Sequence, residues 1–172
     1  MNRWLWWTAL ATVAVAVIVH FITLFAIPIV IMNSAMTKYP QNVLMKGGRT
    51  TADNRMVVRP SPDLVYSILL YDVSQQPIRF KAQVPTDTYW SVAFYAANTD
   101  NFFVLNDQQV KSNPVEILLV KRGGAIPENE TSQVVVSPSD RGIMLVRNLL
   151  VSDDQYDQVV KIQGQSSIEM GY

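Results

Sequence analysis

Hydrophobic positions along this chain form one long unbroken run, followed by many short ones. The long run, from residue 4 to residue 32, reads WLWWTALATVAVAVIVHFITLFAIPIVIM and contains no formally charged side chain. A helix that crosses a bilayer needs only about 20 such residues, so the run predicts a membrane-spanning helix. A cleavable signal peptide has a shorter apolar region of about 7–15 residues, and residues 33–35 form a poor cleavage site, which indicates an uncleaved anchor over residues 1–35.

Short apolar segments begin after a polar stretch. Residues 36–54 show no sustained period and contain Pro40 and the pair Gly47-Gly48, which suggests a loosely packed juxtamembrane stalk. From residue 55 to residue 172, apolar runs such as LVYSILLYDV, YWSVAFYAA and VEILLV alternate with turn residues. This spacing is typical of an antiparallel β-sandwich or barrel, so the second domain is predicted to be mainly β.

One short helix is predicted near the C-terminus. Ser152 can cap it, and Gln155 follows three residues later, as in a capping box. Gly164 can end it. The apolar side chains that would share one face of this helix, against the sheet, are Tyr156, Val159 and Val160.

The 172-residue chain has no net charge, but its charges are unevenly distributed. No acidic residue precedes Asp53, so the four basic residues before it give +4, and the remaining 10 basic and 14 acidic residues give −4. Basic residues flank the apolar run on both sides, so the positive-inside rule only slightly favours a cytoplasmic domain. Because the β domain is net acidic and has no basic stripe, no nucleic-acid partner is expected.

Few residues are available for catalysis. The chain has no cysteine, and its one histidine, His20, lies inside the apolar run. The β domain therefore cannot assemble a Ser-His-Asp triad, a cysteine nucleophile or a zinc site with histidine or thiolate ligands, and no metal site is predicted. Two carboxylate pairs, Asp63 with Asp72 and Asp87 with Asp100, remain formal acid–base candidates, although single aspartates in such positions more often cap turns.

His20 lies near the middle of the predicted span. An imidazole in hydrocarbon is costly unless it has a partner, so such a residue raises a functional hypothesis. It could ligate a haem or a chlorin or contact another helix, or it could be a neutral side chain bonded to a backbone carbonyl or to Thr23. Because polar contacts in membranes are of modest strength, a contact with another helix or a neutral, hydrogen-bonded side chain is favoured over a cofactor, and no cofactor is predicted.

The segment DTYWSVAFYAANTDNFFVLND, residues 87–107, surrounds a small polar cluster with aromatic side chains. Alternation puts Trp90 and Phe94 on one face of a strand and Tyr89 and Tyr95 on the other, so neither face is convincingly polar. One face must lie in the core and the second must meet the C-terminal helix, another protein or a ligand, whereas the polar cluster is better explained as a turn than as a calcium site. The side chains predicted to bind a ligand or a partner are Tyr66, Tyr71, Tyr89, Trp90, Tyr95, Asn98, Asp100 and Asn101.

Several segments resemble those of a known family. Residues 61–73, SPDLVYSILLYDV, and the following PIRFKAQVPTDTYWSVAFYAANTDNFFVL resemble the Asp-x-x-Tyr-Ser, Pro-led strand and Tyr-(Tyr/Trp)-Ser-Val motifs of the bacterial domain of unknown function 1254 family. Residues 137–150, SPSDRGIMLVRNLL, are similar to its Ser-Pro-x-x-x-Gly-hydrophobic-Arg-x-Leu strand, and VHFITLFAIP is similar to the anchor of its short members from alphaproteobacteria. The resemblance implies a jelly-roll β-sandwich, no assigned activity, a periplasmic location and, in longer members, a companion C-terminal domain.

Together these features predict a single-pass protein of the bacterial inner membrane whose β domain stands in the periplasm. We expect a binding or assembly subunit without catalytic activity. Its expected partners are the lipid bilayer and a protein, either a companion-domain membrane protein or a larger membrane complex. The alternative is a small-ligand receptor or a carboxylate-dependent enzyme that uses an aromatic-lined pocket near Tyr66, Tyr89 and Asn98.

Overall fold

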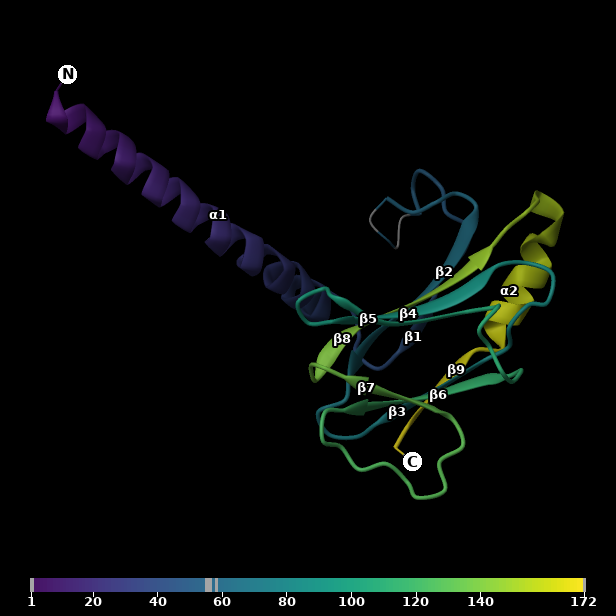
Figure 1. Ribbon diagram of the computed structural model, residues 1–172. Helices are drawn as coiled ribbons and strands as arrows, with labels where there is room; N and C mark the ends of the chain where they lie inside the picture. The colour runs from purple at the N-terminus through teal and green to yellow at the C-terminus, as the bar shows by residue number, and fades with distance from the viewer. Residues whose placement is uncertain (1, 55–56, 58, 172) are drawn as a thin grey trace.

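The computed structural model describes residues 2–54, 57 and 59–171, and it consists of a long helix, α1 (Arg3–Lys38), that leads into a β-sandwich (Figure 1). Within these residues the larger sheet has five strands, in the order β1 (Leu44–Lys46), β2 (Leu64–Asp72), β8 (Arg141–Leu149), β4 (Trp90–Ala96) and β5 (Asn101–Asn106). The smaller sheet has four, in the order β7 (Gln133–Ser137), β6 (Val115–Lys121), β3 (Ile78–Ala82) and β9 (Ser167–Met170). The predicted mainly β architecture behind a long apolar helix is confirmed.

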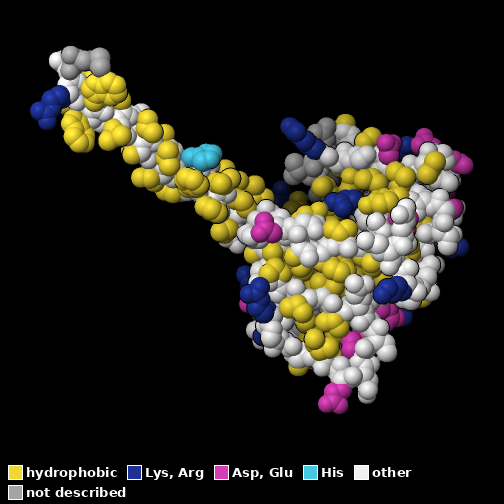
Figure 2. Space-filling model, in the orientation of Figure 1, with side chains coloured by type: hydrophobic (Ala, Val, Ile, Leu, Met, Phe, Trp, Pro, Cys, Tyr) yellow, Lys and Arg dark blue, Asp and Glu magenta, His cyan; other side chains and the backbone are white. Residues whose placement is uncertain are grey.

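α1 is long and apolar enough to cross a membrane. Its most apolar part has a mean hydropathy of 2.7, and hydrophobic side chains cover most of its length (Figure 2). By length and composition the helix could be a membrane anchor or a signal sequence, since both have this character near an N-terminus. The helix extends beyond the predicted apolar run and ends at Lys38.

The core lies between the two sheets. Because side chains alternate along a strand, every second residue of β2, β4 and β8 points inward, and Tyr71, Trp90 and Phe94 are each at most 1% exposed. β3 and β6 supply the facing apolar layer, which includes Phe80 and Ile117. Burying one such large side chain stabilises the fold by about 1.5–3 kcal/mol relative to leaving it in water.

The outer face of the larger sheet is also largely apolar. Ile68, Leu70 and Leu145 belong to a second buried cluster on this face. Met32 and Met36, on the last turns of α1, join the cluster and are 2% and 6% exposed. α1 is therefore attached to the sheet by its C-terminal end, while the rest of the helix projects away from the sandwich (Figure 1).

The segment expected to be a loosely packed stalk, residues 36–54, instead contributes to the sheet. α1 continues to Lys38, and β1 pairs antiparallel with β2, so that Met45 lies opposite Ile68. Asn42 adopts a left-handed conformation, φ 55°, between the helix and this strand. A strand of three residues is too short to show a period in the sequence, so the pattern could not reveal it.

One strand pair departs from the predicted antiparallel arrangement. β6 and β7 run parallel, with Leu119 opposite Val135. Parallel neighbours need a connection that returns across the sheet, and residues 122–132 make this crossover. It passes over the outer face of the smaller sheet, where Glu130 meets Arg79 of β3.

The C-terminal helix is present, but it begins later than predicted. A 3-10 turn, η1 (Asp153–Gln155), precedes α2 (Tyr156–Gly164), and within the described part of the chain Ser152 makes no side-chain capping hydrogen bond to it. The predicted packing face is present, because Val159 is 3% exposed. The buried Gln163 secures the helix to the sheet, since its Nε2 donates to the carbonyl oxygen of Tyr66 at 3.0 Å.

Candidate functional site

Two of the aromatic residues predicted to bind a ligand or a partner lie in the core. Trp90 is 1% exposed, and Tyr71 is fully buried between the sheets. The Tyr71 hydroxyl donates to the carbonyl of Tyr95 at 3.0 Å and lies 3.0 Å from Ser137 Oγ, while burial raises the pKa of Tyr71 to about 12. A Cβ at Gly142 would collide with this hydroxyl, so a glycine is required there. In this chain both aromatic side chains support the fold.

The predicted polar cluster forms the turn between β4 and β5. Asn98 Oδ1 accepts a hydrogen bond from the Asp100 N–H at 3.2 Å, and Asn98 Nδ2 donates to the Asp100 carboxylate at 2.6 Å. Thr99 has φ 69°, and Asn101 begins β5. The turn therefore satisfies its own polar groups, and it lies about 30 Å of extended chain away from Tyr89, at the other end of β4.

Three predicted residues, Tyr66, Tyr89 and Tyr95, lie along the outer face of the larger sheet. Tyr66 is 6% exposed on β2, Tyr95 is half-buried on β4, and Tyr89, just before β4, is 41% exposed. Arg147 of β8 lies among them: it is opposite Tyr66 in the strand register, and its Nη2 donates to the Tyr95 hydroxyl at 3.1 Å. Arg147 was not among the residues predicted to bind a ligand or a partner, although it is an isolated charge within the apolar run GIMLVRNLLV and the arginine of the family-like motif at residues 137–150.

Arg147 belongs to a polar row across four strands, in which Tyr66, Arg147, Ser91 and Asn106 are successive partners; we call it the Arg147 row. The adjacent row on the same face is apolar and consists of Ile68, Leu145, Ala93 and Val104. Ser91 is fully buried, and its hydroxyl has no hydrogen-bond partner among the described residues. Leaving a buried hydroxyl without a hydrogen-bond partner costs about 1–3 kcal/mol. An additional hydrogen-bond partner would therefore stabilise the Ser91 hydroxyl in this row.

The smaller sheet has an arginine in a similar position whose charge is neutralised within the chain. Arg79, half-buried on the outer face of β3, bonds Glu130 through two parallel contacts, Nη1 to Oε1 at 3.0 Å and Nη2 to Oε2 at 2.7 Å. The Ser132 hydroxyl also donates to Glu130 Oε1, at 2.5 Å. The hydrogen bonds from Arg79 and Ser132 lower the pKa of Glu130 to about 2. Arg147, by contrast, forms no ion pair with any residue that the structure describes.

The carboxylate pairs considered from the sequence are separated in the structure. Asp63 directly precedes β2 and Asp72 ends it, so about 30 Å of extended strand lies between them. Asp87 and Asp100 lie before and after β4, at opposite ends of that strand. Neither pair can share a proton or act on the same substrate bond.

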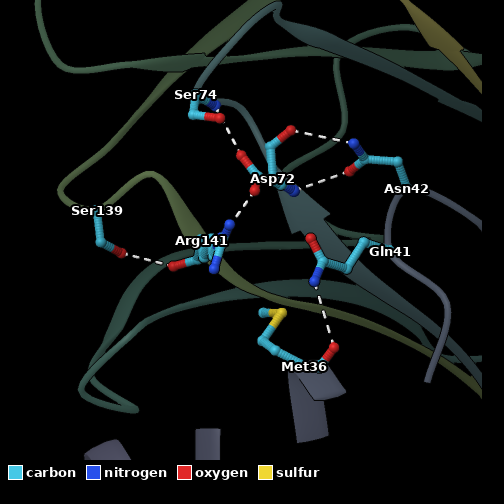
Figure 3. A network of polar contacts seen from close by, with 7 residues as sticks. All are labelled: Met36, Gln41, Asn42, Asp72, Ser74, Ser139 and Arg141. Carbon is cyan, nitrogen blue, oxygen red and sulfur yellow. Dashed lines mark hydrogen bonds and ion pairs between the residues drawn. The ribbon is translucent and has the colours of Figure 1, made fainter. Parts of the chain in front are cut away.

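Asp72 instead fastens the segment that connects α1 to the larger sheet (Figure 3). The Asn42 side chain forms two hydrogen bonds with the backbone of Asp72, at 2.8 and 3.1 Å. The Asp72 carboxylate accepts from the Ser74 N–H at 2.9 Å and from Arg141 Nε at 2.7 Å. Burial acts to raise the pKa of Asp72, but the hydrogen bonds from Ser74 and Arg141 outweigh burial and lower it.

His20 is exposed on α1, where it is the cyan side chain in Figure 2. Its ring meets Phe21 edge-on, with centroids 5.7 Å apart, and Thr23 donates its hydroxyl to the Val19 carbonyl at 2.8 Å. Across the described ranges, no group of three or more His, Cys, Asp or Glu could hold a metal ion. In the single chain the His20 side chain is therefore exposed, and a neighbouring helix could contact it.

A wide open groove of about 1060 Å³ lies beside β5 and the segment that precedes β6. Polar and aliphatic side chains line it, including Lys81, Lys111 and Glu116, and none of the predicted binding residues does. It therefore differs in position and chemistry from the aromatic-lined pocket considered from the sequence.

Comparison with known proteins identifies the family of the chain. Residues 41–170 match the family described as "Protein of unknown function (DUF1254)". The chain belongs to this family. The DUF1254 region spans the β-sandwich, and the resemblance noted in the sequence is confirmed. A comparison with curated proteins gives no match.

Two solved structures share this DUF1254 fold. The VPA0106 protein from Vibrio parahaemolyticus has a TM-score of 0.66 at 13% sequence identity, over 86% of this chain and 35% of that chain. An uncharacterised protein from Burkholderia cenocepacia has a TM-score of 0.51 at 16% identity, over 85% of this chain and 40% of that chain. At these identities the likeness shows the fold alone, and the chain spans well under half the length of either protein.

Proposed function

We propose that this chain is a single-pass subunit of the bacterial inner membrane that binds or assembles with other components, has no catalytic activity and holds its β-sandwich in the periplasm. The direct attachment of α1 to the larger sheet carries the proposal. Met32 and Met36 are buried against Ile68 and Leu70, so removal of the helix would expose an apolar surface of the sheet. This burial favours a permanent anchor over a cleaved signal sequence.

The length of α1 supports a domain held close to the membrane. At 1.5 Å per residue the 36-residue helix is about 54 Å long, whereas the hydrocarbon core of a bilayer is about 30 Å thick. Hydrogen bonds hold the connection after the helix in place, because Gln41 Nε2 donates to the Met36 carbonyl at 3.2 Å and the Asn42 side chain donates to the Asp72 carbonyl. Such an anchor would hold the sandwich at the membrane surface in one orientation.

The distribution of reactive side chains supports a binding role rather than catalysis. The β domain contains no cysteine and no histidine, and its candidate aspartate pairs lie at opposite ends of strands. The most unusual polar group of the larger sheet is the guanidinium of Arg147, whose fork of N–H donors is suited to binding an anion rather than transferring a proton.

The solved relatives support a protein partner. In both of them the region that matches this chain makes up 35% and 40% of the polypeptide, so this fold occurs alongside additional chain. We propose that a companion-domain membrane protein, or a larger membrane complex, takes the corresponding place beside this sandwich. His20 on α1 would be available for a contact between helices within the bilayer.

A small-ligand receptor is the second candidate, and it is favoured by the half-buried Arg147, which has no ion pair among the described residues. A carboxylate-dependent enzyme has no comparable support, because Asp63 and Asp72 cannot meet. The receptor role and the assembly role are compatible, since a ligand bound on the outer face of the larger sheet could be shared with a partner.

Protease accessibility tests the anchor and the orientation. The full-length chain with a C-terminal tag should remain in membranes after a carbonate wash, and added protease should remove the tag in spheroplasts but not in intact cells. Met36→Asp should make the segment after α1 more sensitive to protease, whereas Thr37→Asp, at an exposed position on the same turn, should not. A tag found in the soluble fraction would reject the anchor, and a tag protected in spheroplasts would reject the periplasmic location.

Purification in mild detergent tests the assembly role. The natively expressed, tagged chain should co-elute with a membrane protein in a fixed ratio, as measured by quantitative mass spectrometry. Elution of the chain by itself would contradict the assembly role and leave the receptor as the better proposal.

A further inference from the structure

We propose that Arg147 and Ser91, on the outer face of the larger sheet, form a binding site for the carboxylate group of a ligand. The proposal goes beyond the membrane-anchored assembly role, because it names the chemical group that this face would take. It rests on two polar side chains of the Arg147 row: among the described residues, Arg147 has no ion pair and the Ser91 hydroxyl has no hydrogen-bond partner. The polar side chains around Arg79, by contrast, bond one another.

Arg147 and Ser91 lie next to each other on the same face. They are directly opposite in the β8–β4 register, where Cβ atoms are about 4.5–5.5 Å apart. Both point away from the core, because the alternating neighbours Val92 and Val146 belong to it. An oxygen acceptor placed over this pair could therefore reach the half-buried Arg147 directly, and it could reach the fully buried Ser91 hydroxyl once the side chains that cover it move aside.

Both side chains have hydrogen-bonding capacity to spare. A guanidinium has five N–H donors, and the contact of Arg147 with the Tyr95 hydroxyl uses one of them. The Ser91 hydroxyl is buried and unpaired within the described part of the structure, and no described carboxylate neutralises Arg147. A group that is shielded from water and has unused donors is stabilised by an acceptor from outside the chain.

The smaller sheet shows which acceptor suits an arginine and a serine in this setting. There, Arg79 holds both oxygens of the Glu130 carboxylate, and Ser132 donates its hydroxyl to one of them. Arg147 and Ser91 repeat the arginine and the serine but lack the carboxylate. A ligand carboxylate would complete the same triad.

Charge and surroundings favour a carboxylate over a phosphate. The Arg147 row contains a single cation, and the 10 basic and 14 acidic residues from Asp53 onward give −4, so a multiply charged anion would be poorly compensated. The planar guanidinium fork matches the two oxygens of a carboxylate. Tyr89 and Val104, which are 41% and 48% exposed on the same face, offer contact to an apolar or aromatic body, so we infer a monocarboxylate with such a body.

Titration with benzoate tests the proposal on the full-length protein in lipid nanodiscs. Benzamide, which is neutral and has the same shape, and inorganic phosphate serve as comparison ligands. Isothermal titration calorimetry and NMR spectra of the arginine Nε–Hε groups follow binding. Benzoate should bind saturably and shift the Arg147 resonance, and the two comparison ligands should do neither.

Variants assign the binding to the two residues. Arg147→Gln should weaken benzoate binding about tenfold or more, as expected for loss of a charged hydrogen-bond donor. Arg141→Gln makes the same charge change at an exposed position of the same strand and should leave the affinity unchanged. Ser91→Ala should weaken binding several-fold while the unfolding temperature stays the same or rises, because the change removes an unpaired buried hydroxyl. A purely structural role for Ser91 would instead lower that temperature.

Several results would overturn the proposal. These are no saturable binding of benzoate by folded protein, equal binding of benzamide, preferential binding of phosphate, or unchanged benzoate affinity in Arg147→Gln. Membrane retention and co-purification of a partner test the assembly role without reference to Arg147, so either proposal can fail while the other stands.

Discussion

The outer faces of the two sheets each carry a half-buried arginine on an internal strand, and the two arginines have different surroundings. Arg79 of the smaller sheet holds the carboxylate of Glu130, which is itself bonded to Ser132. Arg147 of the larger sheet meets a tyrosine hydroxyl and lies beside a buried serine hydroxyl with no partner among the described residues. A carboxylate of the chain neutralises the arginine of the smaller sheet, and no described carboxylate neutralises that of the larger sheet. We call the outer face of the smaller sheet the closed face and that of the larger sheet the open face.

Chain connectivity explains the difference. The parallel pairing of β6 and β7 requires the crossover at residues 122–132, which passes over the smaller sheet and carries Glu130 to Arg79. On the larger sheet, α1 packs on the outer face through Met32 and Met36, and Val57 and Ser61 of the connection between β1 and β2 also lie against it, but no described carboxylate pairs with Arg147. The connectivity thus brings a carboxylate of the same chain to Arg79, whereas it brings no described carboxylate to Arg147.

A carboxylate placed next to Arg147 within the chain should close the open face. In Ser91→Asp the new carboxylate lies directly opposite Arg147, so the free energy of unfolding should stay within about 1 kcal/mol of the wild type. In the double variant Ser91→Asp with Arg147→Gln the buried charge has no partner and should cost about 3–5 kcal/mol. Chemical denaturation of the full-length chain in detergent measures both values.

The single variant Arg147→Gln completes this double-mutant cycle and corrects for the loss of the Tyr95 contact. Ser91→Asp should also abolish benzoate binding, because the new side chain occupies the position of the ligand carboxylate. If Ser91→Asp destabilised the protein equally with and without Arg147, the two side chains would not be coupled and the open face would have been misassigned.

Removing the internal carboxylate should open the closed face. Glu130→Gln keeps the shape of the side chain but removes the charge that Arg79 binds, and it should cost about 1.5–3 kcal/mol of unfolding free energy. Glu128→Gln, exposed on the same crossover, is the matched control and should have almost no effect. Similar losses in the two variants would show that the pairing with Arg79 is not what stabilises this face.

The same carboxylate gives a pH signature. The pKa of Glu130 is lowered from 4.5 to about 2 on folding, so its stabilisation is complete above about pH 4.5 and is lost as the pH falls towards 2. The difference in unfolding temperature between wild type and Glu130→Gln should therefore shrink across this window. A difference that is constant down to pH 2 would contradict the lowered pKa.

An exposed ion pair on the same strand should matter least. Lys81 and Glu116 pair at 2.6 Å, but their side chains are 49% and 34% exposed, against 21% for Arg79 and 6% for Glu130. Glu116→Gln should change the unfolding free energy by at most about 1 kcal/mol, and added salt should remove the effect. An effect as large as that of Glu130→Gln would mean that burial does not determine how strongly each of the two ion pairs stabilises the fold.

The elements could be predicted from the sequence because their signals are local. The unbroken apolar run predicts α1, and the runs LVYSILLYDV and YWSVAFYAA coincide with β2 and β4. The polar cluster at Asn98 and Asp100 was expected to be a turn, and the structure has a turn there. Each of these features depends on neighbouring residues alone.

The Arg147 row could not be predicted, because it depends on pairing between distant segments. Arg147 meets Tyr66 and Ser91 only through the register of three strands, and a shift of one residue would turn the arginine into the core. The same limit applies to Tyr71 and Trp90. When both faces of a strand are apolar, alternation separates the faces but does not show which of them lies between the sheets.

The attachment of α1 to the sheet has a mechanical consequence. A helix of about 54 Å acts as a lever on the domain, because the buried Met32 and Met36 and the hydrogen bond from Gln41 hold its C-terminal end against the sheet. Helices in bilayers change their tilt as the local thickness of the membrane changes. If α1 spans the bilayer, such a change in tilt would rotate the whole sandwich and redirect the Arg147 row relative to the membrane surface, so bilayer thickness would control what this face can reach.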